Sequence, residues 1–203
     1  MSDPTTGREK ILVYPLLSGI LLGMSFPPLP TGFLAYAGMI PLLFALRKVT
    51  VGQALKQGLV FGLVFNLITL HFIAFNNGTT PFLATTSFLG MALILTLIGP
   101  FFTLPMALVS RRWGDYGLAA AAPIFWTAIE YLRFLGEIAF PWNVLPLSQG
   151  NYLPALQFIS ITGIWGLSFW LVGANSLVFL ALIRRRWIFA AAAVWIAAPF
   201  IYG

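Results

Sequence analysis

Apolar residues along this chain come in seven long runs, separated by short charged, polar or turn-forming stretches. The runs are Ile11–Phe26, Phe33–Leu46, Leu59–Phe75, Phe82–Val109, Tyr116–Leu132, Leu156–Ile183 and Trp187–Tyr202. A helix that crosses a bilayer needs about 20 apolar residues, and the alternating ten-residue units of a membrane β-barrel are absent. The pattern therefore predicts an all-α, polytopic transmembrane helical bundle of about seven spans.

Some runs are expected to depart from straight, independent helices. The first two runs are short, so both a crossing pair and a hairpin that does not fully cross fit them. The fourth run contains Pro100 and Pro105 and is expected to tilt or kink. Glycines four residues apart let two helix backbones approach, which favours either packing within the protein or a dimer interface. Such pairs occur twice: Gly19 with Gly23, and Gly58 with Gly62.

The composition makes lipid the solvent for most of the chain and removes whole classes of chemistry. Of the 203 residues, 60% are hydrophobic and 8% charged, whereas soluble domains carry about 25% charged residues. There is no cysteine, which excludes disulfides, thiol nucleophiles and thiolate metal sites. The single histidine excludes a metal centre of several histidines. We therefore predict no catalytic residue, no metal and no cofactor for this sequence.

The basic residues predict how the chain threads through the membrane. If seven runs alternate, Arg133 alone falls on one side, and ten basic residues share the other: Arg8, Lys10, Arg47, Lys48, Lys56, Arg111, Arg112, Arg184, Arg185 and Arg186. Lysine and arginine collect on the cytoplasmic side of membrane proteins. Residues 1–10 are therefore expected to form a cytoplasmic N-terminal tail, with Gly203 outside. This reading explains the net charge of +6 without nucleic acid as a partner.

Glu130 and Arg133 are candidates for chemistry, because an ionisable residue near a span usually faces the bundle interior or a wet cavity. Spaced three apart, they fit either a structural ion pair or a site where Arg133 binds a lipid phosphate and Glu130 fixes its rotamer. Trp142 and Gln149 follow in the long external segment Phe134–Pro154. They suit an interfacial aromatic belt or the lip of a headgroup cavity. The predicted lipid-binding or headgroup-binding residues are Arg133, Glu130, Trp142 and Gln149.

A succession of motifs in the second half of the chain resembles a known family. It comprises Trp126–Arg133, Phe140–Asn143, Ser148–Gln149, Gln157, Gly163, Gly166–Phe169 and Asn175. The succession resembles the membrane part of bacterial apolipoprotein N-acyltransferases. The resemblance implies that residues 11–203 form the transmembrane helical domain of a protein of the bacterial inner membrane. It also implies a nitrilase-like catalytic domain outside the membrane, which moves an acyl chain from phospholipid through a cysteine thioester to an apolipoprotein's N-terminal diacylglyceryl-cysteine.

The sequence contains neither a nitrilase-like portion nor a cysteine. We therefore expect the membrane-embedded part of such a protein, truncated or split, and inactive alone. Its expected partners are membrane phospholipid, apolipoproteins and a nitrilase-like domain in trans; a fragment of a longer chain fits equally. The alternative is a small lipid-binding membrane protein or transporter, which would use broken helices around Pro41, Pro100 and Pro105 and the Glu130 carboxylate.

Overall fold

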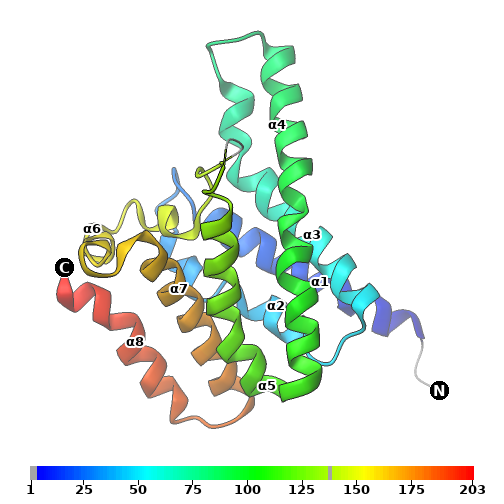
Figure 1. Cartoon of the computed structure of the whole chain (residues 1–203), viewed down its shortest axis with the longest axis vertical. Helices are drawn as coiled ribbons and strands as arrows, with labels where there is room; N and C mark the ends of the chain where they lie inside the picture. The colour runs from blue at the N-terminus through cyan, green and yellow to red at the C-terminus, as the bar shows by residue number, and fades with distance from the viewer. Residues whose placement is uncertain (1–3, 137–138) are drawn as a thin grey trace.

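The computed structural model describes the backbone of residues 4–136 and 139–203, and side chains from residue 12 onward outside that gap. Every regular element in this part of the chain is helical, as predicted. The elements are α1 (Pro4–Met24), η1 (Gly32–Tyr36), α2 (Ile40–Ala45), α3 (Val51–Thr69), η2 (His71–Phe75), α4 (Pro81–Thr96), α5 (Ile98–Leu132), η3 (Leu145–Gln149), α6 (Leu153–Gln157), α7 (Ile159–Ile183) and α8 (Ile188–Tyr202). Figure 1 shows them as a bundle from which α4 and the segment before it project.

The long helices give the bundle its membrane character. Three helical segments are long and apolar enough to cross a membrane: Val51–Phe75, Pro81–Leu132 and Ile159–Ile183. The second contains a sharp turn at Gly114, whose φ of 65° is readily adopted by glycine. Figure 1 shows the chain reversing there, so α5 consists of two parts that run in opposite directions. The turn falls between the fourth and fifth predicted runs.

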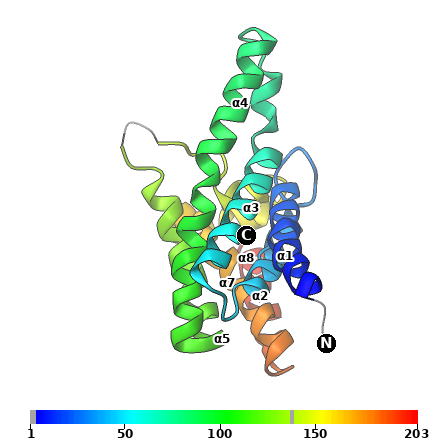
Figure 2. The same cartoon turned by 90° about the vertical axis from the view of Figure 1, so that its right-hand side faces the viewer.

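The expected N-terminal tail, residues 1–10, is only partly covered. Residues 1–3 lie outside the described residues, and α1 begins at Pro4. The side chains of Arg8 and Lys10 also lie outside the described part. Figure 2 shows α1 packed along the same face of the bundle as α3.

The junction between α4 and α5 shows how proline and glycine shape the centre of the bundle. Pro100 has no N–H to donate, and its ring displaces the carbonyl of residue 96, which accounts for the break at Leu97. The backbone of Gly58 and Gly62 in α3 lies against this break so closely that an added Cβ at either position would overlap it. This glycine pair therefore serves packing within the protein.

The second apolar run does not form a single helix. It is divided into η1 and α2, and the six residues of α2 span only about 9 Å of a hydrocarbon core about 30 Å thick. A helix this short leaves backbone groups unpaired at both ends. Side chains from three other helices complete these bonds: Ser18 accepts from the Leu42 N–H (2.8 Å), Asn175 accepts from the Met39 N–H (2.8 Å), and Gln57 donates to the Ala45 carbonyl (3.2 Å).

Asn175 is the central residue of this arrangement. It is fully buried in α7, and its Nδ2 also donates to the Ala35 carbonyl at the end of η1 (2.7 Å). Through these two bonds a side chain of α7 joins η1 to the start of α2.

Replacing Asn175 by leucine tests the role of these bonds. Asn175→Leu leaves the Met39 N–H and the Ala35 carbonyl without partners, so we expect the free energy of unfolding to fall by about 2 kcal/mol. The matched control is Asn151→Leu, because Asn151 is exposed and makes a single bond, to the Leu29 carbonyl (3.2 Å). Its loss is expected to be below about 0.5 kcal/mol. Reversible unfolding in mixed micelles measures both, and equal losses would contradict the assignment.

Candidate functional site

Glu130 joins three elements at the end of the bundle far from Gly114. It lies in the second part of α5, is 1% exposed, and accepts hydrogen bonds from the Leu145 N–H of η3 (2.7 Å) and the Ser168 hydroxyl of α7 (2.5 Å). Leu145 begins a short 3₁₀ helix whose first N–H groups have no partner within the helix. The Glu130 carboxylate thus fixes η3 against α5 and α7.

Arg133, at the end of α5, is held by the loop that follows it. Its Nη2 donates to the Phe140 carbonyl (3.2 Å) and to Asn143 Oδ1. Asn143 Nδ2 in turn donates to Asn66 Oδ1 in α3 (2.6 Å). Arg133 is therefore connected to α3 through one asparagine. We call Asn66, Glu130, Arg133, Asn143 and Ser168 the polar cluster.

Glu130 and Arg133 do not form the ion pair that their spacing allows. The ion pairs among the described residues join Arg47 and Arg184 to Asp115, beside the Gly114 turn of α5. Each member of the Glu130–Arg133 pair instead bonds to backbone or neutral groups. Among the carboxylates that the structure describes, none therefore neutralises the Arg133 guanidinium by direct contact.

A small cavity lies beside the polar cluster. Its volume is about 10 Å³, which is room for one water-sized group. Two of the lining residues carry buried N–H donors, Arg133 Nε and Trp126 Nε1, that have no hydrogen-bond partner among the described residues. Both groups donate only, so the cavity suits an oxygen acceptor. The lining residues are Phe61, Gly62, Phe65, Asn66, Ile98, Gly99, Trp126, Ile129, Glu130, Arg133 and Asn143.

Trp142 and Gln149 lie outside this lining. Trp142 is 59% exposed, and its ring lies 6.1 Å from that of Phe72. Gln149 is fully buried, and its Nε2 donates to the Gly32 carbonyl (2.9 Å), which holds η3 against η1. The structure thus brings together two of the four predicted lipid-binding residues, Glu130 and Arg133. Lipid contact by any of the four stays a prediction.

Sequence reasoning did not find the partners of these residues. Asn66 and Ser168 are polar positions within apolar runs, which indicates that they face the bundle interior. That signal does not say which polar residue meets which, because the pairs are 77 and 38 residues apart. Among the described residues, no three His, Asp or Glu side chains gather closely enough to hold a metal ion.

Comparison with known proteins identifies the family of the chain. Residues 18–177 match the family model of the apolipoprotein N-acyltransferase N-terminal domain, and the match includes every residue of the polar cluster. The chain belongs to the apolipoprotein N-acyltransferase family. The resemblance inferred from the motif succession is confirmed.

Full-length relatives extend well beyond the matched part. The chain is 31% identical to the apolipoprotein N-acyltransferase of Chlorobaculum tepidum over 185 residues, covering 88% of this chain and 33% of that protein. It is 31% identical to the apolipoprotein N-acyltransferase of Geobacter metallireducens, with 87% and 34% covered, and 29% identical to that of Gloeobacter violaceus, with 91% and 37% covered. The chain therefore spans about a third of the length of these curated relatives.

Two substitutions at Glu130 separate its hydrogen bonds from its charge. Glu130→Leu removes both acceptors and leaves the buried Leu145 N–H unpaired, so we expect the free energy of unfolding to fall by about 2–3 kcal/mol. Glu130→Gln keeps an oxygen for Leu145, and its amide N–H can donate to the Ser168 hydroxyl, so we expect a loss below about 1 kcal/mol. Unfolding in mixed micelles measures both. Equal losses would show that the charge of Glu130, rather than its hydrogen bonds, stabilises η3.

Proposed function

We propose that this chain forms the membrane-embedded part of an apolipoprotein N-acyltransferase and presents membrane phospholipid to a catalytic domain. The family match over residues 18–177 carries the proposal, because it spans most of the chain and the whole polar cluster. The apolar helices support placement in a membrane, which for this family we take to be the bacterial inner membrane. The role that we assign to this chain is to bind the phospholipid substrate.

We propose seven spans, with the N-terminus in the cytoplasm and the C-terminus in the periplasm. Ten of the eleven basic residues fall on one side of such a path, as the positive-inside rule requires. The contacts of Asp115 with Arg47 and Arg184 support this path, because they join three segments that it places in the cytoplasm. The polar cluster then lies toward the periplasmic side.

Acyl transfer needs residues that this sequence does not contain. The family resemblance implies a thioester on a catalytic cysteine, and the 203 residues contain none. We therefore assign the chemistry to a nitrilase-like domain, on the same polypeptide or in trans, and the binding of phospholipid to this chain. By itself the chain is inactive in this proposal. The acceptor is the N-terminal diacylglyceryl-cysteine of an apolipoprotein.

The polar cluster is the proposed contact for a lipid headgroup. Arg133 and Trp126 both line the cavity, and their Nε and Nε1 donors have no partner among the described residues; one phosphate or ester oxygen is the acceptor that such a space admits. Glu130 acts indirectly. It fixes the start of η3, and the loop that leads into η3 binds Arg133. Trp142, exposed at the surface beside this loop, lies where it can contact the rest of the lipid. Gln149 supports η3 from inside.

Complementation tests the division of labour. In cells depleted of their own N-acyltransferase, the chain alone is expected to give no triacylated lipoprotein, because it has no cysteine. The chain carrying the nitrilase-like domain of a full-length relative behind Gly203 is expected to restore triacylation, read out by mass spectrometry of lipoprotein N-termini. The same domain fused before Met1, on the proposed cytoplasmic side, is the matched control and is expected to fail. Triacylation by the chain alone, or an inactive but well-inserted C-terminal fusion, would contradict the proposal.

The phospholipid retained by the purified chain tests Arg133. We expect Arg133→Ala to lower the bound phospholipid per protein roughly threefold, because the variant loses charge-assisted hydrogen bonds to the headgroup. Arg133→Lys keeps the charge but lacks Nε, so an intermediate value is expected. Lys10→Ala also removes one positive charge, at a residue that does not belong to the polar cluster, and serves as the control. Unchanged phospholipid in Arg133→Ala would rule out the headgroup contact.

A further inference from the structure

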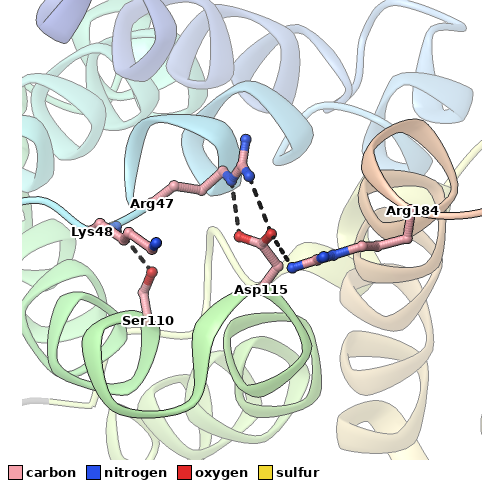
Figure 3. Close-up of polar contacts among 5 residues, drawn as sticks. All are labelled: Arg47, Lys48, Ser110, Asp115 and Arg184. Atoms are coloured by element: carbon pink, nitrogen blue, oxygen red, sulfur yellow. Dashed lines mark hydrogen bonds and ion pairs between the residues drawn. The ribbon is translucent and has the colours of Figure 1, made fainter.

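Three turns of the chain meet at one carboxylate at the end of the bundle opposite the polar cluster. Asp115, just after Gly114, receives hydrogen bonds from Arg47 Nε (2.8 Å) and Arg47 Nη2 (3.1 Å), and from Arg184 Nη2 (2.8 Å). Figure 3 shows the two guanidinium groups approaching Asp115 from opposite sides. Arg47 follows α2 and Arg184 ends α7, so the carboxylate joins three parts of the bundle.

Asp115 orients these arginines but uses few of their donors. A guanidinium carries five N–H groups, and Asp115 takes three hydrogen bonds from the two side chains together. The arginine side chains remain 42% and 43% exposed. The Arg47 hydrogen bonds, followed by the charges of both arginines, hold the pKa of the Asp115 carboxyl below its ordinary value, so the carboxyl is ionised at neutral pH.

Positive charge exceeds negative charge around this carboxylate. The described side chains in and beside the three turns include Asp115 and eight exposed cations, which we call the cationic end: Arg47, Lys48, Lys56, Arg111, Arg112, Arg184, Arg185 and Arg186. The turn before α3 is also fixed, because the Lys48 N–H donates to Ser110 Oγ (3.1 Å; Figure 3). The Arg47 and Arg184 charges are therefore held in place before any ligand arrives, which lowers the entropy lost on binding.

Exposed aromatic rings lie at the same level. Trp113 and Trp187 are each 65% exposed, and Tyr116 is 55% exposed with the Arg184 guanidinium 5.2 Å from its ring centre. Tryptophan and tyrosine collect at the boundary between headgroups and acyl chains. Cations beside such rings face lipid headgroups, and basic clusters at the cytoplasmic side of membrane helices attract anionic lipids.

We propose that the cationic end binds the headgroup of an anionic glycerophospholipid in the inner leaflet, with Arg47 and Arg184 donating to its phosphodiester and Asp115 orienting both. This site is separate from the headgroup contact at the polar cluster, which lies at the other end of the bundle. It rests on the proposed function only for the choice of leaflet, because binding itself does not depend on which way the chain threads.

Lipid titration of the purified full chain in detergent, followed by native mass spectrometry, tests the site. Phosphatidylglycerol is expected to bind about tenfold more tightly than zwitterionic phosphatidylethanolamine. Inorganic phosphate at matched concentration distinguishes a headgroup site from a site for free phosphate, and is expected not to displace the lipid. Displacement by phosphate, or equal binding of the two lipids, would overturn the proposal.

Two double variants of equal charge separate a built site from general attraction. Arg47→Gln with Arg184→Gln is expected to weaken phosphatidylglycerol binding about tenfold, through loss of two oriented guanidiniums. Arg112→Gln with Arg186→Gln removes the same charge but no contact with Asp115, and is expected to weaken it by about twofold. Equal effects would overturn the proposal.

Asp115→Asn gives a test in which the two explanations predict opposite signs. The substitution raises the net charge by one, so attraction by charge alone predicts tighter binding. An oriented site predicts weaker binding, by about threefold or more, because the arginines lose the carboxylate that positions them. Circular dichroism checks that each variant is folded; if Asp115→Asn is not, the paired double variants decide. Reporter fusions give the orientation independently, so a wrong leaflet and a missing site are distinguishable.

Discussion

Backbone groups freed by broken helices must find partners inside this protein, because the lipid around it offers none. The irregular segments are held by side chains of neighbouring helices: Asn175 and Ser18 bond the start of α2, and Glu130 bonds the start of η3. Each of these side chains is buried. Buried polar residues within the apolar runs therefore fix the positions of α2 and η3.

The two ends of the bundle use polar groups in different ways. In the polar cluster, most donors and acceptors are already bonded. Two N–H groups, Arg133 Nε and that of the neighbouring Trp126, have no partner among the described residues, and both residues line a cavity of about 10 Å³. Near Gly114, one carboxylate holds two exposed arginines whose remaining donors face outward. The first arrangement selects a single buried atom, whereas the second gathers charge over a surface. The residues of the polar cluster all lie within the part of the chain that matches the N-acyltransferase family model.

The sequence predicted the helical class and the chain reversal between the fourth and fifth runs, because apolar runs report directly on lipid burial. It also indicated Glu130 and Arg133 as candidate site residues, because charged residues near membrane spans are rare. It did not predict the division of the second run into η1 and α2, because hydropathy reports burial and not helix length. The sequence did not indicate a role for Asp115, because a single acidic residue in a basic turn has the same pattern as an ordinary solvent-exposed residue. Its role depends on Arg47 and Arg184, which are 68 and 69 residues away.

The bonds of Asn175 also constrain the order in which the chain is made. Met39 lies 136 residues before the side chain that accepts its N–H, so a ribosome adds all of these residues before that partner exists. During synthesis, the segment around η1 and α2 has unpaired backbone groups that an apolar environment would penalise. It therefore has to wait near water or within the insertion machinery until α7 has been translated. The first half of the bundle is therefore synthesised early, but its hydrogen bonds are completed only after α7 has been made.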